Sequence, residues 1–168
     1  MQSPPETRLA TSLRDELATL RSFVALLQQE QDSLGAGEIE QVIALVADKS
    51  RLADQLARHS DERCRMLQAL ALTPDAKGME QWLQKSVTPP TPPTSPAPTP
   101  PRMWAEILTL AAQARDLNAL NGKLIAIHFQ HNQQALNTLL AASNQASSLY
   151  GPDGQTHARM GKRLFGAA

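Results

Sequence analysis

Apolar side chains recur at intervals of three and four residues through the first 34 positions of this 168-residue chain. They are Leu9, Leu13, Leu17, Leu20, Val24, Leu27 and Leu34, with Gln31 at the remaining position. This spacing puts all of them on one stripe of an α-helix, and its persistence is typical of a helix that packs lengthwise against another. A capping box with proline at residues 3–6 predicts where the helix begins, and Gly-Ala-Gly at residues 35–37 predicts where it ends.

A second apolar stripe begins directly after these glycines. Its members are Ile39, Val42, Val46, Lys49, Ala53, Leu56, Cys64, Leu67 and Leu70. Because only three residues separate two long helical patterns, the helices are expected to fold back on each other. Residues 1–72 are therefore predicted to form an antiparallel helical hairpin.

The middle of the chain contains a short helix and a proline-rich linker. Thr-Pro-Asp at residues 73–75 predicts a new helix start, and residues 73–86 are assigned to a short helix in which Trp82 caps one end of the bundle. Residues 87–101 hold eight of the twelve prolines and predict an extended, polyproline-like segment. An SH3-ligand role is the less common alternative for PxxP spacing. At roughly 3.1 Å per residue the linker lets the next helix run in either direction.

A last helix is predicted over residues 102–150. Its core stripe is expected to contain Met103, Ile107, Leu110, Ala114, Leu117, Leu120, Leu124 and Ile127. At about 1.5 Å per residue this helix is much longer than the hairpin. It therefore either bends, with Asn121-Gly122 as the candidate position, or projects beyond the hairpin, and projection with some bending is favoured. A Gly-Pro-Asp-Gly turn at residues 151–154 is expected to end it, and residues 151–168 to form a flexible tail.

The C-terminal part of this helix carries a weakly apolar strip. It consists of Asn132, Leu136, Leu139, Leu140, Ala142, Ser143 and Ala146. Isolated leucines among small and polar residues suit an amphipathic partner segment, and a wetter continuation of the core is the alternative interpretation. Tyr150, the single tyrosine, stands at the helix end, where it either closes a core or is contacted by another molecule.

Composition excludes several classes of function. The formal net charge is zero, so no global field attracts nucleic acid or an anionic membrane. The single Cys64 permits no internal disulfide, and charged residues among the first twenty exclude a signal-peptide apolar region. The longest apolar run, residues 42–47, is far too short to insert into a membrane. A cytoplasmic protein is expected, with no nucleic-acid partner and no membrane insertion.

Catalytic and metal-binding patterns are absent from the sequence. His128 and His131 could share a helix face, but no neighbouring acid or cysteine completes a ligand set. The chain has no nucleophile elbow, no phosphate-binding glycine loop and no zinc spacing. We expect a protein that is not an enzyme and needs no cofactor or metal.

Five stretches together resemble the FlgN family of flagellar type III export chaperones. They are LLQQEQDSL at 26–34, DKSRLADQL at 48–56, LNGKLI at 120–125, NQQALNTL at 132–139 and LYGPDG at 149–154. The first two are weakly specific, because many coiled coils look similar. The Asn-Gly run followed by a Leu-Tyr-Gly turn is much more specific. The proline-rich segment departs from the family pattern.

The resemblance implies a cytoplasmic chaperone that binds the C-terminal regions of the hook-associated proteins FlgK and FlgL and delivers them to the export gate. The weakly apolar strip of the last helix, called the client strip below, is then expected to bind these client segments. It implies that Tyr150, flanked by Leu149 and Gly151, docks on the gate protein FlhA. The expected fold is all-α: an elongated antiparallel bundle of three long helices with a short helix and a proline-rich linker between the second and third. We expect a monomer or weak dimer, and the competing hypothesis is a homo-oligomeric coiled-coil scaffold without a secretion client.

Overall fold

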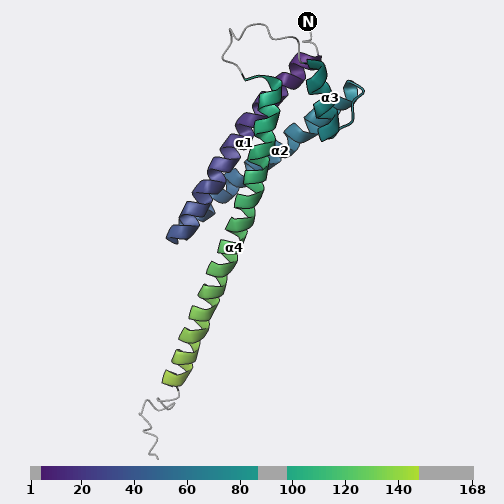
Figure 1. The fold of residues 1–168 in the computed structure, drawn as a ribbon. Helices are drawn as coiled ribbons and strands as arrows, with labels where there is room; N and C mark the ends of the chain where they lie inside the picture. The colour runs from purple at the N-terminus through teal and green to yellow at the C-terminus, as the bar shows by residue number, and fades with distance from the viewer. Residues whose placement is uncertain (1–4, 87–97, 148–168) are drawn as a thin grey trace, which may run out of the picture. The chain divides into compact units, whose positions relative to one another are not determined.

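The computed structural model describes residues 5–86 and 98–147, and this part of the chain contains four α-helices and no strands. The helices are α1 (Pro5–Ala36), α2 (Ile39–Ala69), α3 (Ala76–Ser86) and α4 (Pro100–Ser147), coloured in chain order in Figure 1. The predicted all-α class is confirmed. Residues 1–4, 87–97 and 148–168 lie outside the described part, and with them most of the proline-rich linker, the predicted capping box and Tyr150.

The chain divides into two compact units after Leu124. The first unit contains α1, α2, α3 and the N-terminal half of α4, and the second contains the rest of α4. Helix α4 begins at Pro100, two residues before the predicted start, because proline is well accommodated in the first helical turn. It passes through Gly122 without interruption.

The connection between α1 and α2 is a Schellman motif. The amide of Gly37 donates to the carbonyl of Leu34 at 3.2 Å, and the amide of Glu38 donates to that of Ser33 at 2.9 Å. Gly37 has a φ of 74°, a left-handed conformation that favours glycine. These bonds satisfy carbonyls at the helix end, so the predicted stop at residues 35–37 is confirmed.

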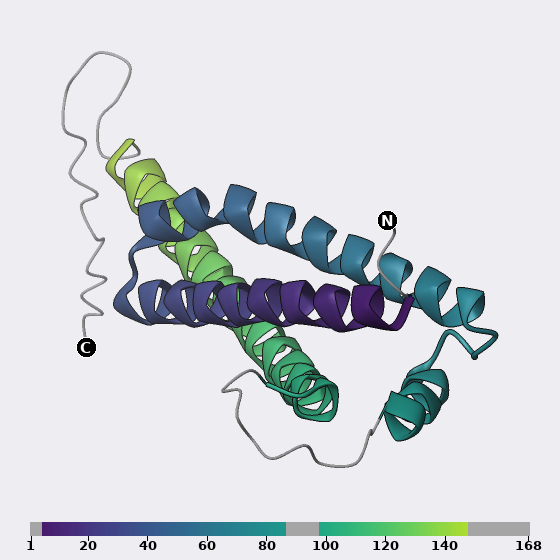
Figure 2. The same ribbon diagram turned by 90° about the horizontal axis from the view of Figure 1, so that it is seen from above.

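Side-chain pairs show that α1 and α2 run antiparallel. From the start of α1 to its end, Glu16 pairs with Arg63, Thr19 with His59, and Glu30 with Lys49. The partner number on α2 falls as the number on α1 rises. Figure 2 shows the two helices side by side along their length.

The predicted stripe of α1 is buried, with Gln31 half-buried, but the predicted stripe of α2 is partly wrong. Ile39, Val46 and Ala53 are exposed, whereas Leu52 is buried and Leu45 half-buried. Two helical registers share Val42, Lys49 and Leu56, and spacing alone does not separate them. Beyond Leu56 the stripe that meets α1 continues through His59 and Arg63, which pair with Thr19 and Glu16 across the interface, so apolar spacing alone does not follow it.

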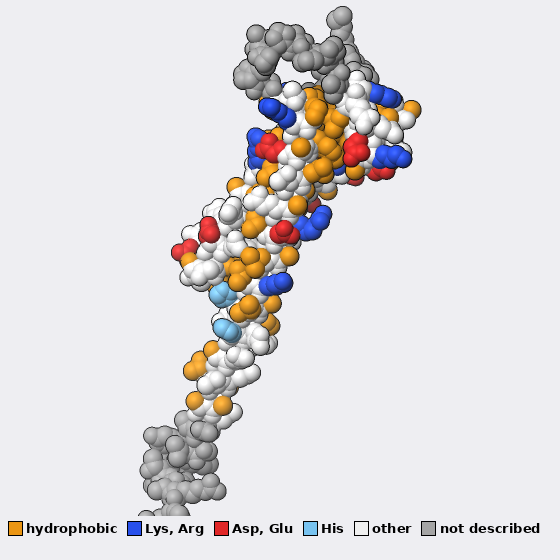
Figure 3. All heavy atoms as spheres, viewed as in Figure 1, with side chains coloured by type: hydrophobic (Ala, Val, Ile, Leu, Met, Phe, Trp, Pro, Cys, Tyr) orange, Lys and Arg blue, Asp and Glu red, His pale blue; other side chains and the backbone are white. Residues whose placement is uncertain are grey.

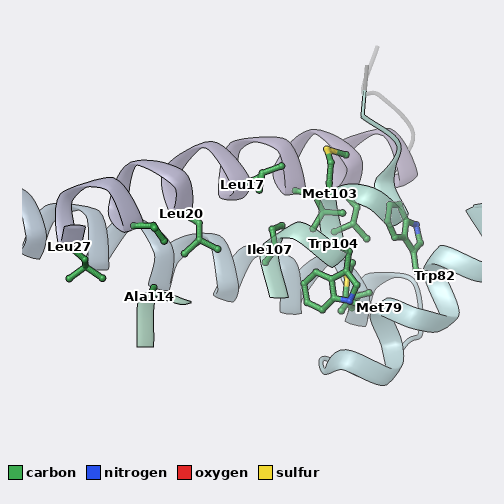
Figure 4. Packing of buried hydrophobic residues seen from close by; sticks show 13 residues of the cluster. Leu17, Leu20, Leu27, Met79, Trp82, Met103, Trp104, Ile107 and Ala114 are labelled. Atoms are coloured by element: carbon green, nitrogen blue, oxygen red, sulfur yellow. The ribbon is translucent and has the colours of Figure 1, made fainter. Parts of the chain in front are cut away.

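The core of the first unit combines all four helices. Leu17, Leu20 and Leu27 of α1 lie with side chains of α3 and α4, as Figure 4 shows. Met79 and Trp82 come from α3, and Met103, Trp104, Ile107 and Ala114 come from α4. Trp82 of α3 is buried in this cluster. Figure 1 shows α3 near the end of the unit where α1 begins.

Within the first unit, α4 runs in the same direction as α1. Glu106, near the start of α4, pairs with Arg21, and Asn121 further along bonds to Leu27 and Glu30. The direction that the linker length left open is therefore decided by side-chain pairing.

Helix α3 begins with a side-chain cap. Oδ1 of Asp75 accepts a hydrogen bond from the amide of Gly78 at 2.9 Å and another from the hydroxyl of Thr73 at 2.7 Å. These two bonds, that from the Thr73 hydroxyl first, lower the pKa of Asp75 below the ordinary value of an aspartate. The predicted N-cap is confirmed.

Candidate functional site

The second unit presents an apolar surface on α4. Every side chain described from Ile125 to Asn144 is exposed, except the half-buried His128. The large apolar residues among them are Ile125, Ile127, Phe129, Leu136, Leu139 and Leu140. Figure 3 shows apolar side chains spaced along this part of the helix. Exposed apolar groups of this number and size, gathered on one helix, mark an interaction surface.

Most of these residues share one face of α4. At 100° per residue, Ile125, Phe129, Asn132, Leu136 and Ser143 lie within a narrow stripe, and Leu139 and Leu140 flank it. Ile127 lies on the opposite face. The strip predicted from the sequence begins at Asn132 and omits Ile125 and Phe129, although the same three- and four-residue spacing extends back to them.

The structure therefore places the described residues of the predicted client strip on one exposed surface, but it does not test what they bind. Ala146 belongs to helix α4, but its side chain is not among those that the structure describes. Leu149, Tyr150 and Gly151, the predicted gate-docking residues, also lie outside the described residues. Their role stays a prediction.

Two residues were wrongly assigned to the buried core stripe of α4. Leu120 and Ile127 are exposed, and the buried position between them is Asn121, which has 0% exposed surface. The stripe that contacts the hairpin runs through Ile107, Ala114 and Asn121 at intervals of seven. Because only apolar side chains were assigned to the stripe, Leu120 was predicted to be buried in place of Asn121.

Asn121 joins three helices through a buried polar network. Its Nδ2 donates to the carbonyl of Leu27 and to Oε2 of Glu30, both at 2.8 Å. Nζ of Lys49 donates to both carboxylate oxygens of the same Glu30, at 3.0 and 2.8 Å. Because a slip of α4 along the hairpin would break these bonds in a dry environment, the network sets the register of the three helices.

A second polar junction lies further toward the start of α1. Arg63 of α2 forms an ion pair with Glu16 of α1, and its guanidinium carbon lies 5.2 Å from the ring centre of Trp104 on α4. Thr19 and His59 add a hydrogen-bond contact of 3.2 Å between α1 and α2. The guanidinium of Arg63 thus contacts both the carboxylate of Glu16 and the ring of Trp104. Both junctions use a glutamate of α1 and a cation of α2, each two heptads from its counterpart.

Gly122 is not required for packing, because a Cβ added there would have no neighbour within 4 Å. The Asn-Gly pair therefore divides into a buried asparagine that bonds to the hairpin and an exposed glycine. Of the two residues, Asn121 carries the structural constraint.

Within residues 5–86 and 98–147, no three His, Cys, Asp or Glu side chains gather where they could hold a metal ion. Over the same residues, none of the helices combines the length and hydropathy needed to cross a membrane.

Comparisons with known proteins place the chain in one family. The model of the family described as FlgN protein matches residues 1–158. The flagella synthesis protein FlgN of Yersinia enterocolitica is 34% identical over 161 residues, which are 95% of this chain and 94% of the relative. The proteins of the same name from Salmonella typhimurium and Escherichia coli K12 are each 29% identical over 160 residues, covering 94% of this chain and 98% of each relative. No solved structure matches. Since the match covers nearly the whole chain, this protein belongs to the FlgN family.

Proposed function

We propose that this protein is a cytoplasmic export chaperone for the flagellar type III pathway. In this proposal, it binds the C-terminal segments of the hook-associated proteins FlgK and FlgL and delivers them to the export gate protein FlhA. Membership of the FlgN family supports a role in flagellum synthesis, because the relatives are named flagella synthesis proteins. The observation that carries the client-binding part is the exposed apolar stripe of α4 from Ile125 to Ser143.

The chemistry of this stripe fits a transient helical client. Phe129, Leu136 and Leu139 provide apolar contacts at helical spacing, and Asn132 and Ser143 lie between or beside them. An amphipathic segment that packs on such a stripe removes its own apolar face from water, which prevents early assembly. Because the stripe is interrupted by polar residues, the bound client can be released at the gate.

The test replaces two leucines of the stripe and compares them with a matched residue on the other face. Leu136 and Leu139 have 56% and 68% exposed surface, and Ile127 on the opposite face has 49%. Leu136→Gln/Leu139→Gln is expected to weaken binding of FlgK and FlgL C-terminal peptides by about tenfold or more, since each buried leucine contributes roughly 1.5–3 kcal/mol. Ile127→Gln is the control and should bind normally in calorimetry.

Equal binding by both variants would refute the assignment of this stripe to the client. Light scattering then separates the competing hypothesis of a homo-oligomeric scaffold, in which the stripe pairs with a second copy. A monomer, or a dimer that dissociates when peptide is added, supports the chaperone. A tight oligomer that peptide leaves unchanged supports the scaffold.

A further inference from the structure

The first turns of α2 carry a second apolar face beside the one that meets α1. Ile39, Ile43 and Val46 have 40%, 66% and 53% exposed surface. At 100° per residue they lie within an arc of about 60°, next to the buried Val42. We call these three residues the α2 apolar face. Large apolar side chains gathered on one exposed helix face indicate a surface that another segment covers.

The chain on both sides of the hairpin turn is acidic. Residues 30–51 contain two basic residues and five acids, a net charge of −3, and the acids are Glu30, Asp32, Glu38, Glu40 and Asp48. Both basic residues are neutralised, because Lys49 pairs with Glu30 and Arg51 pairs with Asp48. Asp32, Glu38 and Glu40 are exposed and form no ion pair within residues 5–86 and 98–147. An apolar segment with basic residues therefore complements this face.

The basic residue of α4 nearest to Asn121 in sequence does not offset this charge. Asn121 bonds to Glu30, so it lies on the face of α4 that meets the hairpin. Lys123 follows two positions later and lies about 200° further around the helix. It is exposed on the side of α4 opposite the hairpin. The carboxylates at the hairpin turn thus stay available to another segment.

A segment with this chemistry follows α4 in the chain. Residues 159–165 read RMGKRLF, with three basic and three large apolar side chains, and residues 155–168 contain no acid. The other two parts outside the described residues, 1–4 and 87–97, contain no charged side chain. The segment also follows the part of the chain that the family model matches, which is residues 1–158.

We propose that residues 159–165 dock on the α2 apolar face of the same molecule. Met160, Leu164 and Phe165 cover the apolar side chains there and remove them from water. The basic residues of the segment pair with the exposed carboxylates of Glu38 and Glu40, which stand directly on either side of Ile39. The contact holds residues 148–158, which include Tyr150, at both ends.

The chain after Asn121 is long enough to return to the hairpin. Asn121 bonds to Glu30, which pairs with Lys49, and Lys49 is one helical turn from Val46. Ser147 follows Asn121 by 26 positions, which is at most about 39 Å of helix. The 13 residues from Ser147 to Met160 span up to about 43 Å when extended. The return is therefore possible whether or not α4 bends.

The size of the α2 apolar face favours a tethered segment over a separate molecule. A stable complex between two proteins buries roughly 800 Å² on each partner. Three side chains that are 40–66% exposed offer much less than this. A segment of the same chain is present at an effective concentration on the order of millimolar, so a small contact is enough to keep it bound.

Photo-crosslinking in the full chain tests the contact. p-Benzoylphenylalanine takes the place of Phe165, and mass spectrometry locates the residues that it joins after irradiation. We expect crosslinks to residues 38–50 of the same chain, with a yield that does not change on dilution. Ile43→Gln/Val46→Gln should lower this yield at least about threefold, because two of the three apolar contacts are lost. Glu38→Gln/Glu40→Gln should lower it severalfold at low salt, and added salt should reduce that difference.

Two control variants match these substitutions. Leu108→Gln changes an apolar residue of α4 that has 51% exposed surface. Asp61→Asn/Glu62→Gln removes two exposed acids from a later part of α2, 18 or more positions beyond Ile43. Both controls should keep the yield of the unmodified protein. Circular dichroism checks that all variants have the same helix content.

Three outcomes would overturn the proposal. The first is a set of crosslinks that falls on the client strip or is spread over the whole hairpin. The second is an unchanged yield in Ile43→Gln/Val46→Gln. The third is crosslinks between two chains, which a mixture of isotope-labelled and unlabelled protein reveals and which rise with concentration. This last result would assign the α2 apolar face to the segment of a second copy.

Discussion

The side-chain amide of Asn121 on α4 donates a 2.8 Å hydrogen bond to the carboxylate of Glu30 on α1, 91 positions earlier in the chain. The same carboxylate accepts both hydrogen bonds of Lys49 on α2. Glu30 thus fixes the register of α2 and of α4 relative to α1. Lys49 compensates the charge of this buried carboxylate, so its removal would leave an unpaired charge in a site with little access to water.

Replacement of Asn121 is expected to destabilise the first unit. Asn121→Ala removes the donor to Leu27 and Glu30 and should lower the free energy of unfolding by about 1–3 kcal/mol. Asn121→Asp should cost more, because it places a second carboxylate beside Glu30. Asn118→Ala, an exposed asparagine one turn earlier, is the control. Urea denaturation followed by circular dichroism measures the difference, and equal stability of Asn121→Ala and Asn118→Ala would disprove the role of the network.

The turn between α1 and α2 contains two glycines whose replacement by alanine should change stability in opposite directions. Gly37 has a φ of 74°, so Gly37→Ala forces a side chain into the left-handed region and should cost about 1 kcal/mol. Gly35 lies in the last turn of α1, and a Cβ there meets nothing within 4 Å. Gly35→Ala should therefore stabilise the helix by roughly 0.5–1 kcal/mol. Thermal unfolding of the two single variants checks the sign, which must differ between them.

The cap of α3 should depend on pH through Asp75. Its folded-state pKa is lowered, so the cap stabilises the folded form at pH values above the unfolded-state pKa. This contribution is lost as the pH falls through the folded-state pKa, which lies below 3.8. NMR titration of the Asp75 carboxyl measures the value directly. Thr73→Val removes the hydroxyl donor and should move the pKa back up, whereas an unchanged pKa in this variant would contradict the assigned cause.

The proposed function assigns Tyr150 to docking on the export gate and not to binding of the client. Tyr150→Ala is expected to bind FlgK and FlgL peptides normally, because the apolar stripe of α4 ends before it. The same variant should lose most of its binding to the cytoplasmic part of FlhA, and Tyr150→Phe should keep a larger share of it through the retained ring. Surface plasmon resonance with both partners measures the two activities. Normal FlhA binding by Tyr150→Ala would remove this residue from the proposed docking site.

Much of the secondary structure could be read from local patterns. The α1 stripe, the Gly-Ala-Gly stop and the Asp75 cap were all predicted at the residues where they occur. Each depends on interactions within a few residues, or on a backbone conformation that only glycine adopts easily. The strip on α4 was predicted from Asn132 onward, whereas the exposed apolar residues of the same face begin seven positions earlier, at Ile125.

The errors arose at particular positions on two helices. On α2 the stripe was assigned through Val46 and Ala53, and on α4 through Leu120 and Ile127, all of which are exposed. On α2, the buried Leu52 belongs to a second register that shares Val42 and Lys49 with the predicted one. On α4, the buried position is Asn121, a polar residue that bonds to Glu30. Hydrophobicity ranks such residues as surface residues, since their burial is favourable only when a partner from another helix is in place.

The sequence by itself thus determined that this chain is helical, where its hairpin turns, and, through family-specific residues, that it belongs to the FlgN family. Only the tertiary structure decided the direction of α4 along α1, the buried register of α2, and the burial of Asn121 beside Glu30. The physical reason is the range of the interactions. Caps, tight turns and helical periodicity depend on residues within one or two helical turns of each other. The register of packed helices and the burial of polar side chains depend on pairs of side chains that are far apart in the chain.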